Sequence, residues 1–124
     1  MAIGCYQGSA ISRKPVVARY FEGFRKSDHG MILECLTEDV VWEIHGFKVL
    51  RGKSEFDAEI ENPAFTGSPT LTLAHCVEEG DTIIATGRGE GKLAAGDSFT
   101  FQFCTLFEFA GQLIAKVESF VVAI

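Results

Sequence analysis

The sequence predicts an α+β domain in which helices come first and an antiparallel sheet follows. Apolar residues recur at helical spacing in the first half of the chain, which is typical of amphipathic helices. From Pro69 onward, apolar and polar residues alternate, and this period of two indicates half-buried strands. The turns Glu79-Gly80-Asp81 and Ala110-Gly111 separate neighbouring strands as hairpins. Helices followed by a meander of four strands favour the α+β class.

Caps and apolar faces predict the helices. Ser12 caps a first helix, which tolerates Pro15 in its first turn. Asp28 caps a shorter second helix. A third helix runs from Ser54 to about residue 62 and is stopped by Pro63. The apolar residues of the first two helices are Val16, Val17, Tyr20, Phe21 and Phe24, and then Met31, Ile32, Leu33 and Leu36.

The strands follow from alternation. A turn at residues 37–39 leads into a first strand, and residues 47–50 form a short partner strand beyond Gly46. Trp42 lies on one face of the first strand with Val40 and Ile44, opposite Val41, Glu43 and His45. Later strands run from residue 82 to about 91 and from 113 to 122, and the strand after Pro69 carries Leu71, Leu73, His75 and Val77 on one face.

The strand at residues 98–109 is the most regular stretch of the chain. Every second residue is a phenylalanine, except at Thr105. The row consists of Phe99, Phe101, Phe103, Phe107 and Phe109. We expect the phenylalanines to face the first helix and to enclose a pocket with it, because aromatic walls with few polar groups are typical of small-molecule sites. Thr105 is then a polar position in the pocket wall.

Composition limits the function. The 124 residues are expected to form one domain, 1–124, with residues 1–12 as an N-terminal arm. The net charge of −6 and the scattered basic residues disfavour nucleic-acid and anionic-membrane partners. The four cysteines and three histidines show no ligand spacing, so we expect reduced thiols, a cytoplasmic location and neither a metal nor a cofactor. No stretch approaches the roughly 18 apolar residues of a membrane span, and no signal peptide is expected.

Four stretches resemble a known family: Val16-Val17-Ala18-Arg19-Tyr20-Phe21, Leu36-Thr37-Glu38-Asp39-Val40-Val41-Trp42, Leu50-Arg51-Gly52-Lys53-Ser54 and Phe107-Glu108-Phe109-Ala110-Gly111-Gln112-Leu113-Ile114. Residues 14–124 resemble the nuclear-transport-factor-two-like superfamily, and within it the SnoaL-like and ketosteroid-isomerase-like group. The resemblance implies a cone-shaped α+β barrel, with N-terminal helices packed on a curved, mostly antiparallel sheet. It also implies a homodimer that pairs through the outer face of the sheet.

The resemblance to ketosteroid isomerases extends to some of their catalytic positions. Those enzymes use a general-base Asp, together with a Tyr and a protonated Asp that bind the oxyanion. Tyr20 matches their Tyr, whereas the base position is Ile44 and the protonated acid position is Thr105. An isoleucine cannot accept a proton, so the usual isomerase mechanism is excluded. Tyr20 is either a core tyrosine or a donor that points into the pocket.

Limonene-epoxide hydrolases offer a second comparison. Their catalytic triad is Asp-Arg-Asp. By resemblance, Arg88 matches the arginine, Glu90 matches one acid and Glu118 falls near the other. Arg88 and Glu90 share a strand face opposite Gly87 and Gly89. They form either an exposed charge network or, if they point inward, a cluster that must be paired because buried charges are costly. Glu118 has the same two possibilities, since a slip of one residue changes its face.

These observations leave three hypotheses. The leading one is binding of a small hydrophobic, cyclic ligand in an aromatic-lined cavity, with cofactor-free isomerase or cyclase chemistry if the protein is an enzyme. The ligand-binding residues would be Trp42, Ile44, Phe101, Phe103 and Thr105. The second is an epoxide hydrolase that uses Arg88, Glu90 and Glu118. If the protein is an enzyme, Tyr20 is a further catalytic candidate, because its hydroxyl would position the ligand. The third is a non-catalytic ligand-binding or dimerisation module. A variant of this hypothesis has the cavity filled by the phenylalanines, so that it binds nothing.

Overall fold

The structure is a computed structural model that describes residues 11–124, so most of the expected N-terminal arm lies outside the described residues. Its helices are α2 (Lys14–Lys26), α3 (His29–Leu33) and α4 (Gly52–Ile60). Its strands are β2 (Leu36–Ile44), β3 (Lys48–Arg51), β4 (Phe65–Glu79), β5 (Thr82–Leu93), β6 (Ser98–Ala110) and β7 (Leu113–Ala123). The strands form a single six-stranded sheet in the order β3-β2-β7-β6-β5-β4. Neighbours are antiparallel except β2 and β7, which are parallel.

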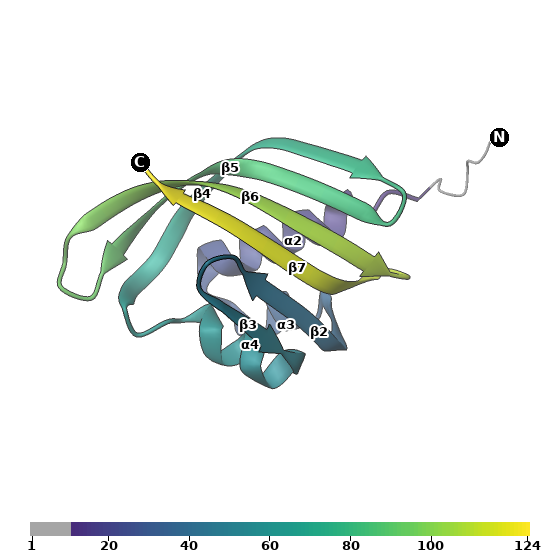
Figure 1. Cartoon of the computed structure of the whole chain (residues 1–124), viewed down its shortest axis with the longest axis horizontal. Coiled ribbons are helices and arrows are strands. Elements are labelled where there is room, and N and C mark those ends of the chain that lie inside the picture. Colours follow the sequence, from purple (N-terminus) through teal and green to yellow (C-terminus); the bar gives the residue numbers. More distant parts are fainter. Residues whose placement is uncertain (1–10) are drawn as a thin grey trace.

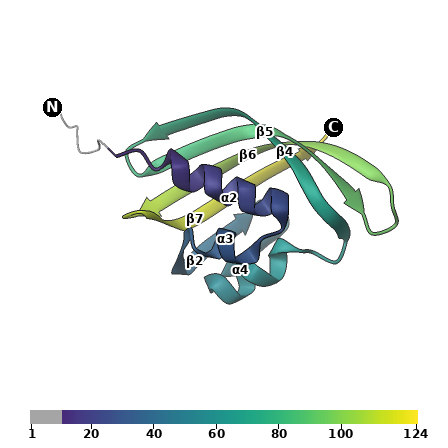
Figure 2. The same ribbon diagram turned by 180° about the vertical axis from the view of Figure 1, so that it is seen from behind.

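The predicted α+β class is confirmed. The sheet is curved and does not close on itself, and the helices lie on its concave side (Figure 1). From behind, α2 runs across the sheet, and α3 and α4 lie beside its end (Figure 2). We call the side of the sheet that faces α2 the inner face and the opposite side the outer face. The buried core lies between the inner face and the helices, where Val17, Tyr20 and Phe21 of α2 are buried.

The start of α2 differs from the prediction by one residue. Arg13, not Ser12, is the N-cap, and the Ser12 hydroxyl accepts a hydrogen bond from the Lys14 amide at 3.1 Å. The Arg13 guanidinium donates to the carbonyl oxygens of Gly80 at 2.7 Å and Gly111 at 3.0 Å. The helix is therefore anchored to two hairpin turns by a side chain. The predicted cap at Asp28 is confirmed, since its carboxylate accepts from the Met31 amide at 3.0 Å.

Three strand and helix predictions need correction. β2 begins at Leu36, and no turn interrupts residues 37–39, because Leu36 is buried and pairs with Ile114 of β7. The third helix begins at Gly52 instead of Ser54, where the Glu55 carboxylate accepts from the Arg51 amide. β4 begins at Phe65 and contains a bulge after Leu73. Because a bulge adds one residue, the side chains of the strand change faces at that point.

The bulge moves His75 off the inner face. Leu71 and Leu73 pack on the core, but beyond the bulge Cys76 is the residue that continues the contact. His75 is exposed, and its ring nitrogen lies 3.2 Å from the hydroxyl of Thr86. Val77 is exposed as well. The four residues predicted to share one face of this strand are therefore divided between both faces.

Glycines of β5 and phenylalanines of β6 form paired rows on the inner face. Gly87, Gly89 and Gly91 are opposite Phe103, Phe101 and Phe99, respectively. A Cβ atom added to Gly91 would lie 2.9 Å from the ring of Phe99, and one added to Gly87 would lie 2.7 Å from the ring of Phe103. The rings therefore lie directly over the glycine backbone, and a side chain at any of these glycines would displace the ring opposite it. We call this arrangement the glycine–phenylalanine ladder.

A histidine joins two helices at the edge of the fold. The Nδ1 atom of His29, in α3, lies 2.6 Å from a carboxylate oxygen of Asp57, and its Nε2 atom contacts Glu61. Asp57 belongs to α4, and Glu61 is the C-cap residue of that helix. Hydrogen bonding to Asp57 and then to Glu61 raises the pKa of His29 above its ordinary value. The bridge is strongest when the imidazole is protonated, because both ring nitrogens then donate.

The ladder predicts that Gly87→Ala destabilises the protein. The new methyl group would clash with the backbone of Thr72 and the ring of Phe103, at an expected cost of about 1–3 kcal/mol. Denaturant unfolding measures the difference. Gly30→Ala is the matched control, since its Cβ would have no neighbour closer than 3.7 Å and alanine favours a helix. Equal midpoints for the two variants would contradict the close packing of the ladder.

The helix bridge predicts a pH-dependent stability. A raised pKa in the folded state means that the contribution of His29 is present below the unfolded pKa and is lost as the pH rises through the folded pKa. His29→Gln should therefore lower the melting temperature more at about pH 6 than at about pH 9, either side of an ordinary histidine pKa near 6.5. Asp57→Asn with Glu61→Gln should remove the same pH dependence. A His29→Gln effect that is equal at both pH values would refute the bridge.

Candidate functional site

Three polar side chains form a row across the inner face of β2, β7 and β6. The indole Nε1–H of Trp42 donates to the hydroxyl oxygen of Ser119 at 2.9 Å. Ser119 is directly opposite Thr105 in the β6–β7 register. Thr105 is 5% exposed and is the one buried polar or charged residue in the described part of the chain besides tyrosine. Trp42, Ser119 and Thr105 are called the polar row below.

Tyr20 approaches this region from α2. It is 3% exposed, and its ring packs edge-on against Phe107 at 5.0 Å between centroids. Its other aromatic neighbours include Phe24, which also contacts Trp42. Burial raises the pKa of the Tyr20 hydroxyl far above its ordinary value. The hydroxyl therefore stays protonated and can act as a hydrogen-bond donor but not as a base.

Aromatic side chains enclose the polar row. Phe103 is buried and contacts Phe21 of α2 at 5.5 Å between centroids, whereas Phe101 is only partly buried. Ile44, at the end of β2, is also partly buried against the core. All five residues predicted to bind a ligand thus contribute to the inner face: Trp42, Ile44, Phe101, Phe103 and Thr105. Their role in binding remains a prediction.

The charged residues predicted for the hydrolase lie on the outer face. Arg88 and Glu90 are exposed, and the glycines on either side of Arg88, Gly87 and Gly89, are buried on the inner side. Both charged residues line a shallow outer groove of about 240 Å³, together with Thr70, Thr72 and Thr100. Within residues 11–124, no ion pair joins Arg88 to Glu90 or Glu118. The inward cluster is therefore not formed, because the alternation that buries the glycines turns the charges outward.

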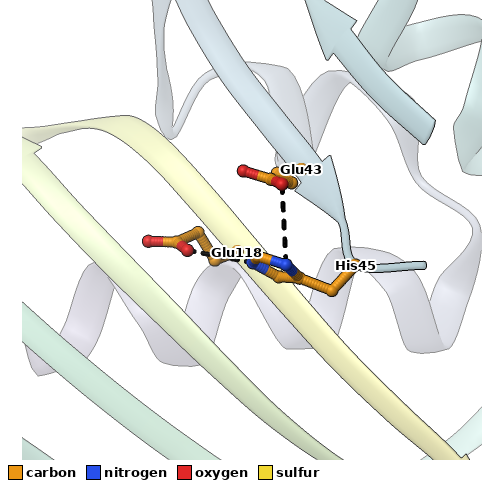
Figure 3. Close-up of side chains that lie close together, drawn as sticks. All are labelled: Glu43, His45 and Glu118. Carbon is orange, nitrogen blue, oxygen red and sulfur yellow. Dashed lines mark hydrogen bonds and ion pairs between the residues drawn. The ribbon is translucent and has the colours of Figure 1, made fainter. Parts of the chain in front are cut away.

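Glu118 has a different set of neighbours on the outer face. One of its carboxylate oxygens lies 3.0 Å from Nε2 of His45, and the other lies 3.9 Å from the ammonium group of Lys116. Glu43 lies on the other side of the imidazole, 3.5 Å from Nδ1. Figure 3 shows the two carboxylates on either side of the histidine ring. The sheet separates this group from the polar row.

Sequence reasoning missed Ser119 as a site residue. Its signal was available, because Ser119 interrupts an apolar alternation between Val117 and Val121 just as Thr105 interrupts the phenylalanines. The grouping of Glu43 with Glu118 was not available from periodicity. It depends on the parallel pairing of β2 with β7, which are distant in the sequence.

Comparison with known families assigns the chain. The SnoaL-like domain matches residues 17–117, which is most of the described chain. The protein belongs to the SnoaL-like domain family. This confirms the resemblance that the sequence motifs indicated. A search of curated proteins finds none that matches significantly.

Solved structures share the fold of this SnoaL-like protein. An NTF2-like protein of unknown function from Burkholderia pseudomallei has a TM-score of 0.84 at 21% identity, covering 90% of this chain and 92% of the other. A putative polyketide cyclase from Pseudomonas putida has a TM-score of 0.74 at 21% identity, covering 90% and 92%. An LEH-like epoxide hydrolase from M. tuberculosis has a TM-score of 0.78 at 14% identity, covering 89% and 82%. At these identities the likeness establishes the fold alone. None of the described helices is long and apolar enough to cross a lipid bilayer.

Proposed function

We propose that this SnoaL-like protein binds a small, apolar, ring-containing molecule on its inner face, with a carbonyl oxygen of the ligand at the polar row. The observation that carries the proposal is the position of two hydroxyl groups, those of Tyr20 and Thr105, among apolar side chains of the core. Within residues 11–124, no hydrogen bond to the hydroxyl of Tyr20 or Thr105 is formed, and the two residues are 3% and 5% exposed. The one fully buried side-chain oxygen without a partner in this part of the chain is Thr37 Oγ1, so the Tyr20 and Thr105 hydroxyls are not sealed, unsatisfied groups. Hydroxyl groups in apolar surroundings normally have hydrogen-bond partners, and a bound water or ligand can be that partner.

The polar row also indicates which chemistry the ligand offers. An indole N–H can only donate, so the Ser119 oxygen accepts from Trp42 and its own proton remains available. Side chains directly opposite each other in an antiparallel pair have Cβ atoms roughly 5 Å apart. The hydroxyls of Ser119 and Thr105 are therefore near enough to donate to one oxygen atom. A ketone or quinone oxygen has the two lone pairs that this arrangement requires.

The same residues limit the catalysis that the site supports. The polar row and Tyr20 contain hydroxyl and indole groups but no carboxylate or imidazole. Such groups can polarise a carbonyl, whereas proton abstraction requires a base. We therefore favour binding, with polarisation of the ligand, over isomerase or cyclase turnover. Catalytic roles for Arg88, Glu90 and Glu118 stay predictions, and their outward direction argues against them.

The neighbours in structure are consistent with a cyclic ligand. One of them is a putative polyketide cyclase, whose name implies ring-containing products. The aromatic wall of Phe101 and Phe103 offers flat apolar surfaces to such rings. The fold itself supports several chemistries, so this likeness ranks below the position of the two hydroxyl groups as support.

A matched pair of probes tests the proposal. Fluorenone and fluorene share one ring skeleton, and only fluorenone carries a carbonyl oxygen. We expect fluorenone to bind more tightly by roughly twofold to tenfold, the value of one net hydrogen bond. Fluorescence of Trp42, the single tryptophan of the chain, reports binding directly. The variants Thr105→Val and Ser119→Ala should remove the preference for the ketone while retaining binding of the hydrocarbon.

The control is Gln102→Ala, which alters the outer face of β6, the strand that carries Thr105. It should leave the affinities for fluorenone and for fluorene unchanged. Two results would overturn the proposal: a folded wild-type protein that binds neither probe, or a preference for fluorenone that survives in both hydroxyl variants.

We also propose that the outer face pairs two copies of the chain, as the family resemblance implies. An apolar row crosses this face from Val77 through Ile84 to Leu106, whose residues are direct neighbours in the strand registers. Val77, Ile84 and the nearby Phe120 and Val122 are exposed. Burying such a stripe against its symmetry-related copy would remove apolar area from water.

Ile84→Arg should convert the predicted dimer to a monomer, because it introduces a charge into the apolar row of both copies. Light scattering measures the mass at a set of protein concentrations. Leu93→Arg is the matched control and should leave the dimer intact. Leu93 is exposed to nearly the same extent as Ile84, 38% against 36%, but it lies at the other end of β5, away from the apolar row. A wild-type protein that stays monomeric at all concentrations would refute this part of the proposal.

A further inference from the structure

We propose that Glu43, His45 and Glu118 form a binding site for one divalent first-row transition-metal ion on the outer face of the sheet. The proposal is independent of the inner-face ligand, because the sheet lies between the two sites. The three side chains provide one ring nitrogen and two carboxylate oxygens that all lie within 4.8 Å of one another. Figure 3 shows Glu43 of β2 and Glu118 of β7 close to His45, which directly follows β2.

Backbone pairing holds the carboxylates in place. Glu43 and Glu118 are register partners in the parallel pair of β2 and β7, so their side chains leave the sheet side by side. The amide of His45 donates to the carbonyl oxygen of Ser119 at 3.0 Å, which fixes the end of β2 against β7. The three positions are thus fixed by the sheet before any ion binds.

An aromatic contact orients the imidazole. The ring of His45 stacks on Phe120 at 4.1 Å between centroids and 10° between planes. This contact restricts the ring to the plane that directs one nitrogen toward each carboxylate. In metal sites the orientation of a histidine ligand is commonly fixed by a hydrogen bond from its second ring nitrogen, and here the stacked ring of Phe120 adds a further restriction.

The donor set suits a metal such as Zn²⁺. Imidazole nitrogen and carboxylate oxygen both bind Zn²⁺ at about 2.0–2.2 Å, so that ligand atoms of a tetrahedral site lie roughly 3.4 Å apart. The nitrogen–oxygen distances here are 3.0 Å for Glu118 and 3.5 Å for Glu43. One ion uses one ring nitrogen, so binding requires one carboxylate to rotate toward the nitrogen that the other already faces. Three protein ligands leave a fourth position for water.

Charge also favours a cation. The side chain of Glu118 is 19% exposed, and that of Glu43 is 36% exposed. Two partly buried carboxylates so close together repel each other, and a cation between them removes that repulsion. Lys116 provides only partial neutralisation, because its ammonium group lies 3.9 Å from Glu118. It also competes with a metal for this carboxylate, so its removal should strengthen metal binding.

Zinc titration calorimetry on the full chain tests the site. We expect one Zn²⁺ per chain, and the near-isosteric variants Glu43→Gln and Glu118→Gln should each weaken binding by about tenfold or more. His45→Gln should have at least the same effect. Lys116→Gln should strengthen binding.

Acidification should weaken Zn²⁺ binding, because the imidazole must be neutral to bind a metal. Fluorescence of Trp42, which precedes Glu43 in β2, provides a second readout.

The controls separate this site from other metal-binding groups. His75→Gln alters a histidine on the same face that lies outside the group, and it should leave the Zn²⁺ affinity unchanged. Co²⁺ absorption should lack the charge-transfer band of thiolate ligands, which excludes binding through the cysteines. The proposal fails if the wild-type protein binds no Zn²⁺, if the glutamine variants bind as tightly as the wild type, or if the Co²⁺ spectrum shows thiolate ligation. Absence of binding would indicate that His45 instead acts as a hydrogen-bonded link between the two strands.

Discussion

The glycine–phenylalanine ladder of β5 and β6 is the constraint on which the rest of the structure depends. Each phenylalanine ring occupies the space that a side chain at the opposite glycine would need. The inner face of β5 is therefore covered by aromatic rings that belong to β6. This close approach leaves room for α2, whose Phe21 packs on Phe103 and Phe107. The ladder thereby sets how near the first helix can lie to the sheet.

The same constraint decides where charges go. Because the inner side of β5 has only glycine at residues 87, 89 and 91, all the functional groups of that segment project from the outer face. Arg88 and Glu90 are consequently exposed. Polar groups on the inner face must come from other strands, and the polar row takes them from β2, β6 and β7. Thr105 lies within the aromatic row of β6, between Phe103 and Phe107, where a sixth phenylalanine would fill the space beside α2.

Much of the fold followed from the sequence because alternation and capping are local signals. The aromatic row, the cap at Asp28 and the order of helices and strands all depend on residues near one another in the chain. The faces of His75 and Val77 were assigned wrongly because a bulge is a one-residue irregularity, and alternation alone does not reveal it.

The candidate site was predictable to the extent that its residues interrupt a pattern. Thr105 was found as a gap in the phenylalanines, whereas Ser119 lies in a strand with weaker alternation and was overlooked. Its contact with Trp42 connects residues 77 positions apart. Such a contact follows from strand order, and strand order is a property of the whole sheet.

The parallel pair of β2 and β7 gives this protein two chemically different surfaces from one short segment. Trp42 and Ser119 face inward, while Glu43 and Glu118, their immediate neighbours in sequence, face outward. The hydrogen bond inside and the carboxylate–histidine contacts outside hold the same two strands together. A change in the spacing of those strands would therefore alter both faces at once.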